Sequence, residues 1–183
     1  GIDDQVGTIE VGKRADVVIK DTVPVYLDFL PVQGVVLRRD TLPQGYDVLA
    51  IVDCGDLGRT GMFDHTSPPV KLVVNIDHHP KSEDFGDIYW VDEQASATGV
   101  MIYRLLQAGG WDVSLDVAVC LYTTILSDTG SFRYSNADPE AFRVAGEMVA
   151  RGVDPWSIAS GLYESQEESR LRLLGLALPT LDV

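Results

Sequence analysis

The sequence predicts an α/β fold with a mainly parallel sheet flanked by helices. Three short β-branched runs have the length and composition of buried strands. Helical patterns lie between and after these runs, and such alternation is typical of a layered α/β domain. The predicted strands are ADVVIK (15–20), YDVLAIVD (46–53) and KLVVNID (71–77).

The helical patterns carry recognisable start and stop signals. Ser96 and Thr98 are candidate caps of the first helix, which a Gly-Gly pair ends. The second helix is apolar nearly all round, so we expect it to be buried. The third and fourth open with Asp-Pro, a cap followed by a first-turn proline. The four segments are 94–110, 114–128, 138–152 and 154–165.

Length and composition indicate an ordinary globular protein with one main domain. The 183 residues suffice for a core, and 45% of them are apolar and 23% charged. No run of eighteen apolar residues occurs, and the first residues do not resemble a signal peptide, so we expect no membrane association. Cys54 and Cys120 lie in apolar segments and are expected to be buried and reduced, as in a cytoplasmic protein.

The strong negative charge limits the class of partner. The chain has 28 acidic and 14 basic residues, a net charge of −14. A protein that binds long nucleic acid through its phosphates needs a basic surface, so this balance argues against that class. Solubility alone could explain the charge. The alternative is that some carboxylates hold divalent cations, which then receive an anionic substrate.

The domain organisation is predicted from the same patterns. Residues 1–165 are expected to form the main domain, and 166–183 a linker toward a second domain outside this sequence. The last residues, LPTLDV (178–183), resemble a strand.

Acidic and histidine side chains cluster where two predicted strands end. Asp53 follows the strand VLAIV, and Asp77 follows LVVNI directly before His78 and His79. Ligands of open parallel sheets gather at the carboxyl ends of the strands. A further acid, Asp128, lies where the buried helix enters a glycine turn. Carboxylates with imidazole suit Mn²⁺ or a related cation, and the lack of a CxxC motif argues against structural zinc.

Three weaker signals remain open. Arg59, between glycines in DCGDLGRTG (53–61), is either a phosphate contact or an ion-pair partner of Asp56. The segment ASATG (95–99) offers hydroxyls and amides at a helix start, where an anion could bind. His65 is expected to be a loop histidine without a direct role.

Three motifs in order resemble those of the DHH phosphoesterase superfamily. They are AIVDCGDLGRTG, NIDHHP and LYTTILSDTGSFRY, and their spacing also fits. The flanks DTVPVYLDFLP and YESQEESRLRLLGLALPTL resemble the oligoribonuclease/pAp phosphatase (nanoRNase) branch. The resemblance implies a Rossmann-like DHH domain, and a cytoplasmic, homodimeric enzyme that hydrolyses short oligoribonucleotides and 3′-phosphoadenosine 5′-phosphate.

The resemblance also implies a two-metal site with Mn²⁺, or alternatively Mg²⁺. Asp53 would bridge both ions, while His78 and Asp128 would complete the ligands of one. His79 would contact the substrate phosphate, as Arg59 could, and Asp77 would orient an imidazole N–H. Two cations roughly 3.5–4 Å apart can activate a bridging hydroxide for attack on phosphorus.

The sequence departs from the family pattern at its first motif. The family has His-x-x-x-Asp-x-Asp there, whereas only GIDDQVGT remains, which places Asp4 on the second aspartate and Asp3 on the spacer. The register is open, so Asp3 is an alternative ligand. A helix of about 12 residues cannot fit before the strand at 16, which suggests missing residues near 9–10. With the C-terminal substrate-binding domain also absent, we expect little or no activity from these 183 residues alone.

Other functions have partial support in the sequence. The stretch GTIEVGKRADVVI (7–19) resembles part of the amidohydrolases, but the paired barrel histidines are missing and the chain is too short. A related phosphodiesterase acting on cyclic dinucleotides or single-stranded DNA would share the same core. A non-catalytic nucleotide-binding relative would explain the incomplete first motif, although the later motif residues are all present.

Overall fold

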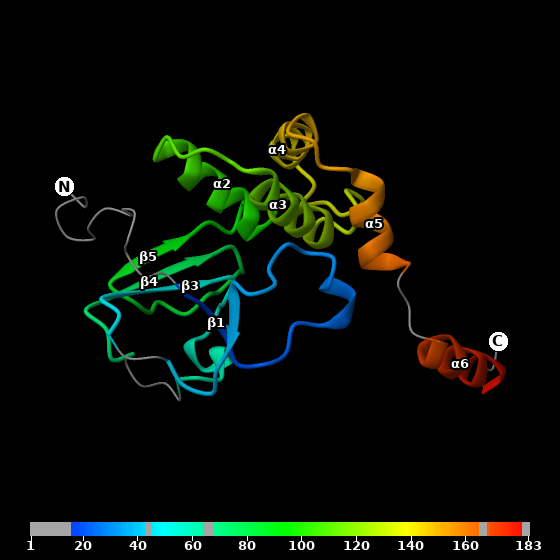
Figure 1. Ribbon diagram of the computed structural model, residues 1–183, viewed down its shortest axis with the longest axis horizontal. Helices are drawn as coiled ribbons and strands as arrows, with labels where there is room; N and C mark the ends of the chain where they lie inside the picture. The colour runs from blue at the N-terminus through cyan, green and yellow to red at the C-terminus, as the bar shows by residue number, and fades with distance from the viewer. Residues whose placement is uncertain (1–15, 43–44, 64–67, 165–167, 181–183) are drawn as a thin grey trace.

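The computed structural model describes residues 16–42, 45–63, 68–164 and 168–180, and it has the predicted α/β organisation. Strands and helices form two layers, with α2 to α5 stacked over one side of the strands (Figure 1). The strands are β1 (Val17–Ile19), β2 (Val36–Arg38), β3 (Val48–Val52), β4 (Leu72–Asp77) and β5 (Ile88–Val91). The α-helices are α2 (Thr98–Ala108), α3 (Leu115–Asp128), α4 (Pro139–Ala150), α5 (Pro155–Tyr163) and α6 (Glu168–Ala177). Short 3₁₀ helices are η1 (Val25–Leu27), η2 (Leu57–Thr60) and η3 (Leu178–Thr180).

All strand pairs among the described residues are parallel, as predicted. β3, β4 and β5 form one sheet in that order, and β1 pairs with β2 in a second. The three predicted strands are confirmed, with trimmed ends. β2 and β5 were not predicted, because each has only three or four residues and lies outside the three longer β-branched runs from which the strands were predicted.

The central strand β4 separates two small cores. Val73 packs with Ile51 and Phe63 on one face of the sheet. Ile76 points to the other face and packs with Met101 of α2. This alternation along a strand is why successive residues at its end also point in different directions.

The helical layer forms the largest core. Helix α3 packs against α2, α4 and α5, and its residue Ile125 is fully buried with Val144 and Met148 of α4. The expectation that this helix, apolar nearly all round, is buried is wrong in part, since Leu115 and Val117 in its first turn are exposed. The cap predictions at Asp138 and Asp154 are confirmed, because each carboxylate accepts a backbone N–H of the first turn.

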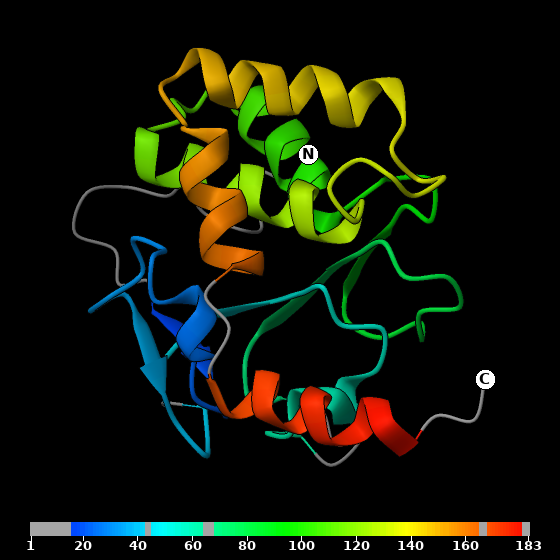
Figure 2. The same ribbon diagram turned by 90° about the vertical axis from the view of Figure 1, so that its right-hand side faces the viewer.

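The end of the chain differs from its prediction. Leu178–Thr180 form η3 rather than a strand, and 181–183 lie outside the described residues. Pro179 has no N–H to donate to a sheet ladder, which makes a strand unfavourable here. Helix α6 lies apart from the helical layer (Figures 1 and 2). Its leucines are exposed. The interpretation of 166–183 as a linker stays a prediction.

The structure also bears on the two cysteines and on the expectation that no membrane span is present. Cys54 and Cys120 are both free thiols, Cys54 buried as expected and Cys120 only half-buried. Among the helices of the described residues, none combines the length and the apolar character that a membrane span requires.

Candidate metal centre

Strands β3 and β4 end side by side at one edge of the sheet. Val52 pairs with Ile76 in the parallel register, and the Asp53 N–H donates to the Ile76 carbonyl at 2.9 Å. Asp53 and the last residue of β4, Asp77, therefore lie at the same carboxyl edge, as the sequence predicted. This is the edge at which open parallel sheets bind ligands.

Asp53 leaves its strand in a left-handed conformation. Its φ is +59°, which costs a residue with a Cβ about 1–2 kcal/mol. Such conformations persist where the surroundings hold them, commonly at functional sites. One of the contacts that hold Asp53 in place is a hydrogen bond from the Thr98 hydroxyl to Asp53 Oδ1, at 2.8 Å.

Thr98 therefore has a different function from the predicted one. Ala97 occupies the N-cap of α2 without a side-chain cap, so the expectation that Ser96 or Thr98 caps this helix is wrong. The Thr98 hydroxyl reaches across to Asp53 instead. The Ser96 hydroxyl is buried and has no hydrogen-bond partner among the described residues. Anion binding at 95–99 stays a prediction.

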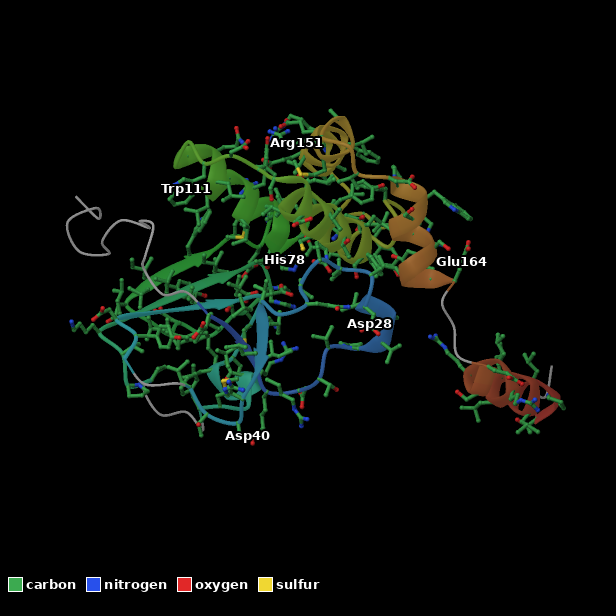
Figure 3. The ribbon with its side chains drawn as sticks, viewed as in Figure 1. Asp28, Asp40, His78, Trp111, Arg151 and Glu164 are labelled. Atoms are coloured by element: carbon green, nitrogen blue, oxygen red, sulfur yellow. The ribbon has the colours of Figure 1, made fainter. Side chains whose placement is uncertain are left out.

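His78 lies between the strands and the helical layer (Figure 3). Its Nδ1 is 3.1 Å from the Ala95 carbonyl, which can only accept, so Nδ1 carries the proton. In the neutral ring Nε2 then carries no hydrogen and can bind a cation, and it lies 3.6 Å from Asp53 Oδ1 and 3.6 Å from Asp128 Oδ2. The side chain is 16% exposed, so this nitrogen faces carboxylates with little access for bulk water.

His79 has a different set of partners, as the alternation along a strand predicts. Its Nδ1 donates to Asp77 Oδ1 at 2.7 Å and lies 3.9 Å from Asp53 Oδ1. The Asp77 side chain is fully buried, and its other oxygen has no partner among the described residues. Burial acts to raise the pKa of Asp77, but the hydrogen bond from His79, with Ser82 nearby, holds that pKa below its ordinary value.

Asp128 approaches the same cluster from the C-terminus of α3. Burial, and then the negative charge of Asp53, raise the pKa of Asp128 above its ordinary value. The Asn136 amide donates both to the Asp128 carbonyl, at 3.1 Å, and to the Ser96 carbonyl, at 3.0 Å. Asn136 thereby ties the end of α3 to the segment that leads into α2.

The donor set fits a divalent cation. Asp53, His78 and His79 offer ligand atoms that all lie within 4.8 Å of one another. Asp128 faces the same His78 nitrogen, and a cation there would relieve the repulsion between its carboxylate and that of Asp53. Carboxylate oxygen and imidazole nitrogen together suit Mn²⁺, Mg²⁺, Zn²⁺ or Fe²⁺ more than a soft metal. The Nδ1 of His79 is already used by Asp77, so its Nε2 is the nitrogen left for a ligand or substrate.

Some predicted site residues do not join this cluster. Arg59 is exposed in η2 and makes no ion pair with Asp56, which instead accepts the Gly58 N–H at 2.6 Å. The phosphate contact of Arg59 stays a prediction. The residues Asp3, Asp4 and His65, like the junction near 9–10, lie outside the described residues.

Sequence reasoning missed the residues that orient the cluster. Thr98, Asn136 and the Ala95 carbonyl make the hydrogen bonds described above, and none was assigned that role. The signal available was the position of ASATG between two motifs that carry site residues. Threonine and asparagine are too common at helix ends and turns for that position alone to identify them.

A cluster of carboxylates and imidazoles at the carboxyl edge of a parallel sheet defines an α/β protein with a candidate metal centre. Residues 5–125 match the DHH family, N-terminal domain. The chain therefore belongs to the DHH family.

Curated and solved relatives agree with this assignment. The bifunctional oligoribonuclease and PAP phosphatase NrnA of Bacillus subtilis is 30% identical over 124 residues, 66% of this chain and 40% of that protein. The NrnA protein of Thermus thermophilus is 33% identical over 160 residues, 86% of this chain and 47% of that protein. The crystal structure of an exopolyphosphatase-related protein from Bacteroides fragilis superposes with a TM-score of 0.80 and 28% identity, covering 92% of this chain and 52% of that one. The chain thus spans about half the length of these relatives.

Proposed function

We propose that this chain is the catalytic core of a metal-dependent phosphoesterase that hydrolyses short oligoribonucleotides and 3′-phosphoadenosine 5′-phosphate. The observation that carries the proposal is the position of His78 Nε2 between the carboxylates of Asp53 and Asp128. The similarity to NrnA proteins supports the choice of substrate. Mn²⁺ is the proposed metal, on the chemistry of the donors.

The proposed ligands are Asp53, His78 and Asp128, with Asp4 or Asp3 completing a second site. When bound, such cations polarise a phosphate ester and lower the pKa of water. The chain's own contribution is to hold the ligands in place: the Ala95 carbonyl fixes the tautomer of His78, and Thr98 fixes one oxygen of Asp53.

His79 is proposed to bind the substrate phosphate. Its Nδ1–H is held by the buried Asp77 carboxylate, which orients the ring. Donation from Nε2 to a phosphate oxygen requires the doubly protonated ring, and Asp77 is the counter-ion beside it. A small anionic substrate also fits an acidic chain better than a long polymer does.

The test is substitution of Asp53 in the intact protein, including any sequence beyond these 183 residues. Asp53→Ala should abolish Mn²⁺-dependent turnover, because it removes the carboxylate shared by His78 and Thr98. Hydrolysis of 3′-phosphoadenosine 5′-phosphate, a diribonucleotide, a cyclic dinucleotide and a short single-stranded DNA is measured side by side. Asp47→Asn is the matched control, since Asp47 flanks the opposite end of β3 and pairs with Lys71 at the surface.

Near-normal activity of the Asp53→Ala protein would refute the assignment. Preference for the cyclic dinucleotide or the DNA would move the protein to the related phosphodiesterases. Metal-dependent nucleotide binding by the wild-type protein without any turnover would identify a non-catalytic relative.

A further inference from the structure

Arg104 of α2 connects three parts of the chain. Its Nη1 donates to Asp92 Oδ2 at 2.5 Å, in the segment that follows β5. Its Nε and Nη2 both face the Glu140 carboxylate in the first turn of α4. A guanidinium can serve two carboxylates because its donors lie in a rigid plane, which a lysine cannot reproduce.

Asp92 in turn closes a tight turn with its own backbone. The Asp92 N–H donates to the Asp77 carbonyl, and the Asp92 carbonyl accepts the Ala95 N–H, both at 3.0 Å. Its side chain uses Oδ1 to accept the Gln94 N–H at 3.0 Å. One carboxylate oxygen therefore faces Arg104 while the other shapes the turn that ends at Ala95.

The end of this turn is the hydrogen-bond partner of His78. The Ala95 carbonyl accepts the Nδ1–H of His78, and Ala95 is only 4% exposed. With so little access, water is poorly placed to replace that carbonyl if the turn moves. The proton on Nδ1 is what leaves Nε2 free to face Asp53 and Asp128.

We propose that Arg104 is a positioning residue that sets the tautomer and orientation of His78 through the turn Asp92–Ala95. This role deepens the proposed function, because the nitrogen that it exposes is the proposed metal ligand. Arg104 itself contacts none of the described members of the cluster. The proposed path to His78 runs through the Asp92 carboxylate and not through Glu140, so the proposal predicts which substitutions disturb His78 and which do not.

The test uses two measurements on the intact protein. The tautomer of His78 is determined from long-range ¹H–¹⁵N spectra of the metal-free protein, with His78→Gln used to assign the ring signals. The affinity for Mn²⁺ alone is measured by titration calorimetry. For Arg104→Gln we expect a mixture of tautomers and Mn²⁺ affinity about 10-fold weaker, at the lower end of what residues behind metal ligands contribute.

Two further variants separate positioning from general stability. Glu140→Gln removes the other ion pair of Arg104 but leaves its bond to Asp92, so wild-type tautomer and affinity are expected. Asp92→Asn keeps an oxygen for the Gln94 N–H and loses the charge that faces Arg104, so a smaller shift in the same direction is expected. This variant also decides the matter if Arg104→Gln does not fold.

Wild-type tautomer and affinity in every Arg104 and Asp92 variant that folds would overturn the proposal. An equal shift in Glu140→Gln would also overturn it, because the effect would then be a general loosening. If the wild-type protein binds no Mn²⁺, the proposed function fails, while the tautomer of the metal-free protein still decides the role of Arg104.

Discussion

At the scale of single residues, the cluster depends on hydrogen bonds that hold its ligands from behind. The Asp53 side chain is 53% exposed, so water could satisfy its oxygens, yet Thr98 fixes one of them. The Thr98 hydroxyl thus orients the Asp53 carboxylate, and it does not shield that carboxylate from water. For a metal ligand, that distinction matters, because coordination requires defined directions.

Thr98→Val should therefore weaken Mn²⁺ binding by about 10-fold while leaving the fold intact, because valine has the shape of threonine without its donor. Thr98→Ser should retain near wild-type affinity. The matched control is Thr123→Val, which removes a buried hydroxyl that donates to the Val119 carbonyl of its own helix. Unchanged affinity in Thr98→Val, measured by calorimetry, would contradict the orienting role.

At the scale of elements, α2 and α3 approach so closely that only glycine fits at one contact. A Cβ on Gly99 would lie 1.9 Å from Thr124 Oγ1 and 3.1 Å from its Cβ. Thr124 has little freedom to rotate away, because it is β-branched and its hydroxyl donates to the Leu121 carbonyl. This contact sets the spacing of the helices that carry Thr98 and Asp128.

Gly99→Ala should consequently destabilise the protein by about 1–3 kcal/mol, through overpacking. Gly146→Ala is its counterpart in α4, where a Cβ meets nothing within 4 Å, and it should stabilise by about 0.5–1 kcal/mol. Urea denaturation measures both free energies of unfolding. Adding Thr124→Ala to Gly99→Ala should restore part of the loss, and absence of any recovery would show that this contact is not the cause.

The same elements show which parts of the fold and of the site can be predicted from the sequence. The apolar runs predicted β3 and β4, and parallel pairing then required Asp53 and Asp77 to meet at one edge. Asp128, which lies far along the chain, was a candidate from its place at a glycine turn, and the resemblance added its role as a metal ligand. The tie from Thr98 to Asp53 spans 45 positions, and the tie from Arg104 to Glu140 spans 36. Local patterns cannot predict such contacts, because tertiary packing alone decides which side chains face one another.

At the scale of the whole molecule, some of the many acidic side chains form ion pairs that connect separate elements of the fold. Asp92 and Glu140 belong to different layers, and both pair with Arg104. The hydrogen bond from Arg104 is the main cause that lowers the pKa of each carboxyl below its ordinary value. Through Arg104 of α2, Asp92 links the helices to the strand layer and Glu140 links α4 to α2, and both carboxyls are stabilised in their charged form.

These shifts predict how stability changes with pH. A carboxyl whose folded pKa is lower than its unfolded pKa stabilises the fold above the unfolded value, 3.8 for Asp92 and 4.5 for Glu140, and loses that contribution as pH falls through the folded value. The free energy of unfolding of the wild-type protein should thus fall more steeply than that of Arg104→Gln between about pH 5 and pH 2. Arg172→Gln is the control, since its pair with Glu168 is largely exposed and should leave the slope unchanged. Parallel curves for wild type and Arg104→Gln would mean that the ties through Arg104 do not contribute to the stability of the fold.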